Sequence, residues 1–178
     1  MGLNPFFTIG HSTRTVEALA DLLVEAGANA VADVRTIPRS RTNPQFNLDV
    51  LPGALAERQI AYQHIAALGG LRGRRKDGDP SPNAFWENAS FRNYADYADT
   101  DPFRAGLADL IALGEIHVCA VMCAEAVWWR CHRRIIADYL IAAGAVVFHI
   151  MGPGKITPAT MTPAARRAGG ERLIYPLA

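Results

Sequence analysis

Short, continuous apolar runs alternate along the chain with longer segments in which apolar residues recur every three or four positions. Continuous runs are typical of parallel strands buried on both faces, and the longer spacing is typical of the helices that cover them. We therefore predict strands over residues 6–9, 30–34, 60–65, 116–122 and 145–151. Helices are predicted over residues 16–26, 47–58, 91–98, 102–113 and 128–143.

Three of the predicted helices begin or end at residues that favour helix termini. Thr13 or Thr15 can cap the first helix by accepting a backbone N–H, and Gly27 can end it. Asn47 is expected to cap the second helix, and Asp101, followed by a proline, the fourth. These signals place the helices between the apolar runs.

Two stretches are less regular. Residues 69–90 are rich in Gly, Pro, Arg, Asp and Asn, and we expect a long loop there, mobile over 70–85. Further on, Thr162 and the proline after it are expected to begin a short helix that ends at Gly169. Residues 172–175 are expected to add an edge strand.

The alternation of strands and helices predicts βαβ units and a parallel sheet with helices on both faces. The expected fold is a three-layer α/β, Rossmann-like fold with a mostly parallel sheet of five strands, or six if the edge strand joins it. No repeat and no second domain is visible in the sequence. We expect one α/β domain over residues 1–178, with 152–178 as a C-terminal extension.

Composition is that of an ordinary globular protein. Of the 178 residues, 50% are apolar and 20% are charged. No apolar run reaches the roughly 18 residues that cross a bilayer, and residues 1–5 lack the start of a secretion signal. Three cysteines, Cys119, Cys123 and Cys131, are an odd number for a disulfide framework. We expect a cytoplasmic protein with reduced thiols and no membrane partner.

Chemically distinctive residues follow four of the predicted strands. In open α/β sheets, ligands bind outside the carboxyl ends of the strands, which share one edge of the sheet. The residues at those ends are His11 and Ser12, Asp33 and Arg35, Gly69 and Gly70, and Cys123 and Glu125. Their convergence predicts a single site at that edge.

Cys123 lies between a predicted strand and a helix. A helix N-terminus and nearby cations stabilise a thiolate, and Arg130 and Arg133 could supply that charge. Glu125 or His132 could move a proton. The alternative is that Cys123 is a small residue packed in the core.

Known cysteine motifs fit this segment only in part. Protein phosphatases and rhodaneses have five residues between the cysteine and an arginine, whereas six separate Cys123 from Arg130. Nucleobase deaminases have a metal-binding residue two positions before a glutamate, which Cys123 and Glu125 match, but their second motif is absent.

A metal site would use Cys123, Cys131 and His132, with His11 as a fourth ligand. Because neighbouring residues on a helix point about 100° apart, Cys131 and His132 could not both bind one metal without strain. We therefore expect no metal and no other cofactor.

Five short motifs occur in order along the chain. They are Thr8-Ile9-Gly10-His11-Ser12, Asp33-Val34-Arg35 with Pro38 and Ser40, Tyr62 before Leu68-Gly69-Gly70, Cys123-Ala124-Glu125, and Cys131-His132-Arg133. Together they resemble the bacterial "domain of unknown function 488" family over about residues 6–150. The resemblance implies a compact α/β domain without a settled activity, whose cysteine and charged motifs point toward an enzyme.

We expect a hydrolase or transferase that acts on an anionic small molecule, phosphorylated or nucleotide-like. Cys123 is the expected nucleophile or ligand and Glu125 the proton carrier. His11, Asp33 and His132 are expected to orient them. Guanidinium forks suit phosphate and carboxylate groups. The residues expected to bind the substrate are Ser12, Arg35, Ser40, Arg41, Tyr62, Gly69, Gly70 and Arg133.

Two other functions stay open. Residues 35–76 hold eight basic and two acidic residues, which would suit a non-catalytic module that binds nucleic acid or another anion. Widening the window to 33–79 adds three aspartates, and the whole chain has a net charge of only +1, so a solvated surface explains the stretch equally well. The third function is a metal- or redox-responsive protein that uses Cys123 and Cys131.

Overall fold

A six-stranded mixed sheet forms the centre of the molecule, in a computed structural model that describes residues 2–178. The strand order is β3 (Ala61–His64), β2 (Ala30–Asp33), β4 (Cys119–Cys123), β1 (Phe6–Gly10), β5 (Val147–Gly152) and β6 (Lys155–Pro158). The first five strands are parallel, and β6 runs antiparallel to β5. The expected α/β fold with a mostly parallel sheet is confirmed.

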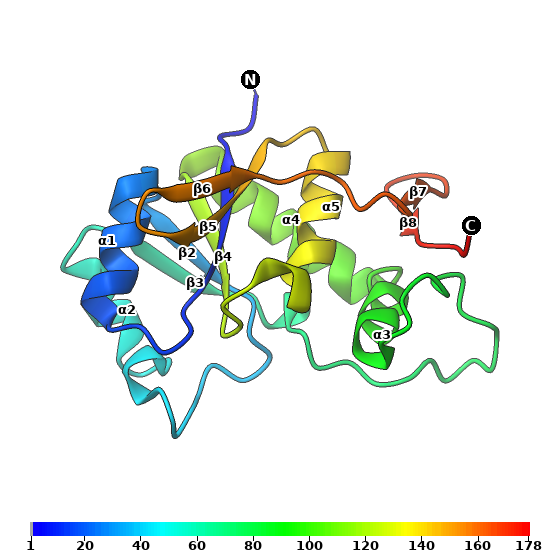
Figure 1. The fold of residues 1–178 in the computed structure, drawn as a ribbon, viewed down its shortest axis with the longest axis horizontal. Helices are drawn as coiled ribbons and strands as arrows, with labels where there is room; N and C mark the ends of the chain where they lie inside the picture. Colours follow the sequence, from blue (N-terminus) through cyan, green and yellow to red (C-terminus); the bar gives the residue numbers. More distant parts are fainter. Residues whose placement is uncertain (1) are drawn as a thin grey trace.

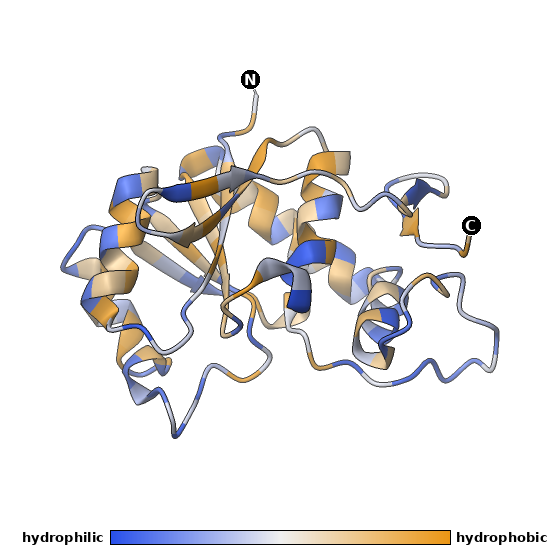
Figure 2. Ribbon diagram, in the orientation of Figure 1, coloured by the Kyte–Doolittle hydropathy of each residue, from blue (hydrophilic) through white to orange (hydrophobic). Residues whose placement is uncertain are grey.

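Helices cover both faces of the sheet (Figure 1). One face carries α1 (Val16–Ala26) and α2 (Leu51–Ala56), whose leucines pack with Ile9 and Val31. The other carries α4 (Asp101–Ile116) and α5 (Arg133–Ala142). The remaining helix, α3 (Ala89–Tyr97), lies beyond the end of α5. Hydrophobic and hydrophilic residues alternate along each of these helices, as expected of helices with one buried side (Figure 2).

The first helix has the predicted termini. The side chain of Thr15 accepts a hydrogen bond from the backbone N–H of Ala18 at 3.0 Å. Gly27 ends the helix with a φ of 79°, a left-handed conformation that glycine adopts without steric cost. Between them Leu19 and Leu23 are fully buried against the sheet. Of the described helices, none is long and apolar enough to cross a membrane.

Two predicted helix starts were wrong. Asn47 does not cap a helix, because its side chain accepts the backbone N–H of Ser40 at 2.7 Å, and α2 begins only at Leu51. The cap of α4 is Thr100, and Asp101 is its first residue. The observed caps, Val50 and Thr100, lie three positions and one position away from the expected ones.

The predicted helix over 128–143 is shorter than expected. Residues Trp128–Arg130 form a separate 3-10 turn, and α5 begins at Arg133. Cys131 and His132 therefore lie at the junction of the turn and the helix. Because these two residues are not part of a continuous helix, the expectation that their side chains point about 100° apart was wrong.

The end of the chain also differs from the prediction. The helix expected from Thr162 to Gly169 is absent, because the Thr162 backbone N–H donates instead to buried Asp138 at 2.9 Å. The short strands β7 (Arg166–Arg167) and β8 (Leu173–Ile174) pair only with each other. The sixth strand of the main sheet is instead β6, which follows a tight turn at Gly154 with a φ of 68°.

The order of the strands creates a crevice between β1 and β4. The chain leaves β1 through α1 toward β2 on one side, and leaves β4 through α5 toward β5 on the other. The carboxyl ends of two such strands form the usual ligand site of an open α/β sheet. Gly10 and Cys123 are partners in this register. A side chain at Gly10 would collide with the backbone carbonyl of Glu125, so only glycine lets the loop after β4 cross here.

Candidate active site at the ends of three strands

A cavity of about 580 Å³ opens at the carboxyl ends of β1, β2 and β4. Most of the residues predicted to form the site line it, although they come from distant parts of the sequence. The predicted residues in its lining are His11, Arg35, Ser40, Gly70, Cys123, Glu125 and His132, and Cys131 joins them. The convergence inferred from the strand ends is thus found in the structure.

Six predicted site residues do not line the cavity. Asp33, Tyr62 and Arg133 lie behind the lining residues and hold them in place. Gly69 packs against Thr36, and Ser12 follows β1 with a left-handed φ of 51°. Arg41 is exposed and outside the lining.

The two thiols of the site are in contact. The Sγ atoms of Cys123 and Cys131 lie 2.6 Å apart, and both residues are more than nine-tenths buried at the wall of the cavity. Cys123 ends β4, and Cys131 lies in the link just before α5, so the sheet and the segment before the helix each contribute one thiol. The third cysteine, Cys119, lies at the other end of β4 in the core.

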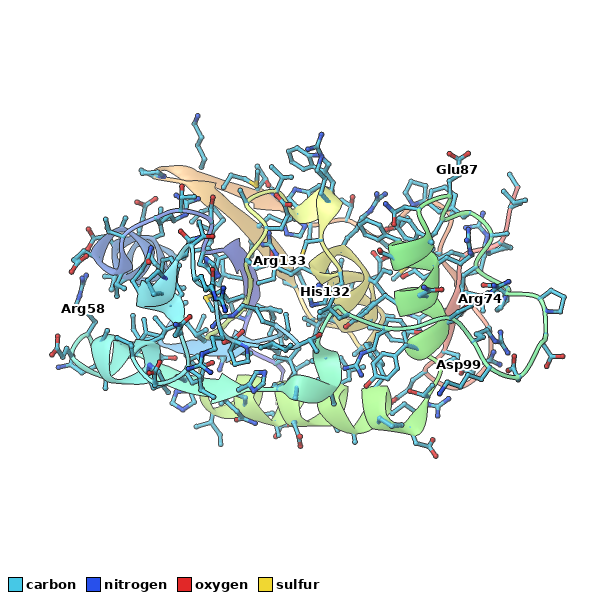
Figure 3. All side chains as sticks on the ribbon, turned by 90° about the horizontal axis from the view of Figure 1, so that it is seen from below. Arg58, Arg74, Glu87, Asp99, His132 and Arg133 are labelled. Carbon is cyan, nitrogen blue, oxygen red and sulfur yellow. The ribbon has the colours of Figure 1, made fainter. Side chains whose placement is uncertain are left out.

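A buried guanidinium lies behind this pair. Arg133, the first residue of α5, is 1% exposed. Its Nε donates to Cys123 Sγ at 3.0 Å, its Nη1 to the hydroxyl of Thr8 at 3.0 Å and its Nη2 to the backbone carbonyl of Glu125 at 2.7 Å. Figure 3 shows Arg133 and His132 in the interior of the molecule, whereas the labelled Arg58, Arg74, Glu87 and Asp99 lie at its periphery.

The orientation of the His132 ring follows from its contacts. Its Nε2 lies 2.8 Å from the backbone carbonyl of Val34, which can only accept, so Nε2 carries the proton. The unprotonated Nδ1 then faces Cys131 Sγ at 3.4 Å. Gly70 and Tyr94 hold the ring, because a side chain at Gly70 would approach Nδ1 within 2.6 Å and the Tyr94 ring lies 5.0 Å away.

These neighbours separate the two thiols chemically. Burial by itself raises the pKa of Cys131, but the hydrogen bond from Cys123, the charge of Arg133 and the backbone N–H of Arg133 outweigh it and lower the pKa to about 7. Burial and the neighbouring Cys131 raise the pKa of Cys123 well above its ordinary value. The surroundings of Cys131 therefore favour its thiolate form, whereas those of Cys123 favour the thiol.

The opposite wall of the cavity is built around Arg35. Asp33 accepts from both the Nε and Nη2 of Arg35, at 2.9 and 2.7 Å, and Tyr62 donates its hydroxyl to the same carboxylate. A further bond from Nη2 to the Phe46 carbonyl, at 2.7 Å, completes the hold on the guanidinium. The Nη1 group is left facing His11 and the cavity.

His11 is neutral in this arrangement. Its Nδ1 lies 2.9 Å from the Ser12 backbone carbonyl and must donate to it, so the free lone pair is on Nε2, 3.4 Å from Arg35 Nη1. Burial lowers the pKa of His11, and the charge of Arg35 acts in the same direction. The ring also stacks on Phe46 with 4.3 Å between centroids.

The mouth of the cavity contains residues that the sequence analysis missed. Ile37, Leu71 and Phe91 form an apolar part of its lining, and Ile37 and Leu71 are 64% and 73% exposed. Arg39 was missed as well, whereas Arg130 was expected near Cys123; both line the mouth, and neither guanidinium is in an ion pair with another described residue. The position of Arg39 shortly after β2 was the signal available in the sequence.

The residues considered for a metal site do lie together. Cys123, Cys131 and His132 share one wall of the cavity. Within residues 2–178, however, no three or more histidine, cysteine, aspartate or glutamate residues are arranged to hold a metal ion.

The fold and the cavity define an α/β protein with paired thiols at the carboxyl edge of its sheet. The chain belongs to the family described as "Domain of unknown function DUF488", whose model matches residues 15–140. That match includes four of the five motifs, and the motif at residues 8–12 precedes it. Searches of curated proteins and of solved structures found no match.

Proposed function

We propose that the protein is a thiol-dependent hydrolase or transferase that acts on a small molecule with an anionic group. The observation that carries this proposal is the environment of Cys131, whose thiolate is stabilised by Cys123, by Arg133 and by the N-terminus of α5, at the wall of a cavity. A lowered pKa in an electropositive site beside a cavity is typical of a reactive cysteine rather than a structural one.

The neighbouring groups supply the proton transfers that such a reaction needs. Cys131 Sγ attacks the electrophilic atom and the bond to the leaving group breaks. Where Cys131 still carries its proton, His132 Nδ1, 3.4 Å from the thiol, takes it up and returns it to the leaving group. Where Cys131 attacks as the thiolate, the leaving group takes its proton from water. The carboxylate of Glu125 lines the same cavity and accepts a proton from the water or acceptor that releases the covalent intermediate.

The charges and the apolar surface suggest how the substrate is held. Arg35, Arg39 and Arg130 present guanidinium groups to the cavity, which suit a phosphate or carboxylate. Ile37, Leu71 and Phe91 offer an apolar surface beside them, which fits the planar part of a nucleotide-like molecule.

Two alkylating reagents of similar shape test this proposal. Iodoacetate carries a negative charge and iodoacetamide does not, so the ratio of their rates at Cys131 reports on the positive charge in the cavity. We expect this ratio to be at least about threefold higher than for free cysteine, as one favourable charge at short range would give. Arg39→Gln and Arg130→Gln should each lower the ratio, whereas Arg41→Gln, outside the cavity, should not.

The nucleic-acid-binding alternative has less support. Within the basic stretch, Arg58 forms an ion pair with Asp21, Arg75 with Asp77 and the buried Arg35 with Asp33. These three charges are therefore already compensated within the protein. Tight binding of an oligonucleotide with a steep loss of affinity in salt would overturn the enzyme proposal in favour of that alternative. So would alkylation of Cys131 that is no faster than alkylation of Cys119.

A further inference from the structure

The thiol nucleophile proposed above needs one cysteine, yet the structure holds a second thiol in contact with it. The Sγ atoms of Cys123 and Cys131 are 2.6 Å apart, only slightly further than the ~2.05 Å of a disulfide bond. The two residues are eight positions apart; Cys123 ends β4, and Cys131 lies between the 3-10 turn and the start of α5. A disulfide between them therefore requires very little movement of either element.

We infer that Cys131 and Cys123 form a redox-active dithiol that reduces a hydroperoxide and closes to a reversible disulfide. This activity is separate from the proposed hydrolase or transferase reaction and does not depend on its substrate. It rests on the contact between the two thiols, on the charges around them and on the cavity that both cysteines line, which has room for a small oxidant.

The environments of the two thiols give them different parts in the reaction. The Cys131 thiolate attacks one oxygen of the peroxide, the O–O bond breaks, and the other oxygen leaves as hydroxide or alkoxide and takes a proton from water. Cys131 is then a sulfenic acid. Cys123, which retains its proton, attacks the Cys131 sulfur: the S–S bond forms, the S–O bond breaks, and the hydroxyl leaves with the Cys123 proton as water. Two thiols are oxidised and one peroxide is reduced.

The buried Arg133 decides how stable this disulfide is. In the reduced protein the Cys131 thiolate offsets the charge of the guanidinium, which donates to Cys123 Sγ at 3.0 Å. Oxidation removes that negative charge and leaves the cation buried, with no carboxylate among the described residues in an ion pair with it. An uncompensated buried charge is costly, so the reduced form is favoured and a small thiol such as glutathione should reopen the bond.

The third cysteine provides an internal comparison. Cys119 lies in the core between the sheet and α5, outside the cavity lining, and burial raises its pKa to about 12. At pH 7 its thiolate fraction is smaller than that of Cys131 by a factor of about 10⁵, only partly offset by its greater intrinsic nucleophilicity. We expect Cys131 to react with peroxide at least about 100-fold faster than Cys119 in the folded protein.

The experiment treats the purified, reduced full-length protein with one equivalent of hydrogen peroxide at pH 7. We expect the loss of two free thiols per chain in the monomeric band, and their return with glutathione. Trypsin cleaves after Arg130 and Arg133, so the disulfide should join the peptide of residues 131–133 to that of residues 105–130. The Cys119→Ala variant should behave like the wild type and assigns the bond to Cys123.

The Cys123→Ser variant separates the two chemical steps. It should still react with peroxide, but stop at a Cys131 sulfenic acid that dimedone traps, whereas Cys131→Ser should react at least about tenfold more slowly than the wild type. Oxidation of the wild type that gives only intermolecular disulfides, or sulfinic acid with both remaining thiols free, would overturn the inference. The outcome of the peroxide experiment does not decide the outcome of the iodoacetate test, so the redox inference and the proposed function can fail separately.

Discussion

The guanidinium Nε of Arg133 lies 3.0 Å from the Sγ of Cys123, in the buried layer between the sheet and α5. Within residues 2–178 no carboxylate forms an ion pair with this arginine. A buried cation is stable only when it is paired or fully hydrogen-bonded, and the thiol pair is the group that can provide the negative charge. We therefore expect the thiol pair to carry the negative charge that compensates the buried Arg133.

Replacing Arg133 should raise the pKa of the reactive thiol. In Arg133→Met the cation is lost, and we expect the pH midpoint of Cys131 alkylation to rise by at least about one unit. Arg133→Lys keeps the charge and should give a smaller rise. The neighbouring Arg134, whose side chain reaches Thr162, provides the control, and Arg134→Met should leave the midpoint unchanged. If the pH midpoint of Cys131 alkylation shifted equally in the Arg133 and Arg134 variants, Arg133 would affect the thiol only through the stability of the fold.

Adding a methyl group at Gly70 should disturb His132. The added Cβ would lie 2.6 Å from Nδ1, so the ring must move away from Cys131. We expect Gly70→Ala to slow the reaction of Cys131 with iodoacetamide by about tenfold, the equivalent of about 1.4 kcal/mol from one lost hydrogen bond. The control is Gly73→Ala, since a side chain at Gly73 meets nothing within 4 Å. A Gly70→Ala protein that reacts at the wild-type rate would exclude His132 as a partner of the thiol.

The stability of the fold should fall in mild acid because buried histidines stay neutral. His149 accepts the Thr8 hydroxyl and stacks on Trp128, and burial together with the charge of Arg133 lowers its pKa from 6.5 to about 4. Above pH 6.5 the histidine is neutral in both states. Between pH 6.5 and about 4 the unfolded chain binds a proton that the folded protein does not, so the free energy of unfolding decreases as the pH falls.

Between pH 6.5 and about 4, His149 should decrease the free energy of unfolding by up to about 3 kcal/mol. Burial also lowers the pKa of His11 and His132, so these two residues further decrease the free energy of unfolding as the pH falls. Urea unfolding at a series of pH values measures this dependence, and His149→Gln should reduce it because glutamine can accept the Thr8 proton without titrating. A free energy of unfolding that rises between pH 6.5 and pH 4.5 would contradict the assignment.

The fold was predictable from the sequence wherever a local signal decided the structure. The apolar runs gave five strands within a few residues of their true ends, and Thr15 and Gly27 marked the ends of α1. The prediction failed where long-range contacts outweigh local preference. Thr162 has the sequence of a helix start, but its backbone N–H pairs with Asp138, which no sequence pattern reveals.

The site was predictable in its location but not in its chemistry. Strand ends placed His11, Arg35 and Cys123 at one edge, and these three residues line the same cavity. The contacts of Cys131 with Cys123 and with the backbone of Arg133 depend on the short turn before α5. The sequence predicted a continuous helix from residue 128, and that prediction did not place Cys131 in contact with Cys123.

The central claim is that Cys131 is the thiolate of this site, and the pH dependence of its alkylation tests the claim most directly. The rate of iodoacetamide labelling of each cysteine in the folded protein can be followed by mass spectrometry of its tryptic peptides between pH 5 and pH 10. The account predicts that Cys131 is labelled first, with a midpoint near pH 7, and that Cys119 reacts only after denaturation. Labelling of Cys123 before Cys131, or a Cys131 midpoint above the roughly 8.5 of a free thiol, would contradict it.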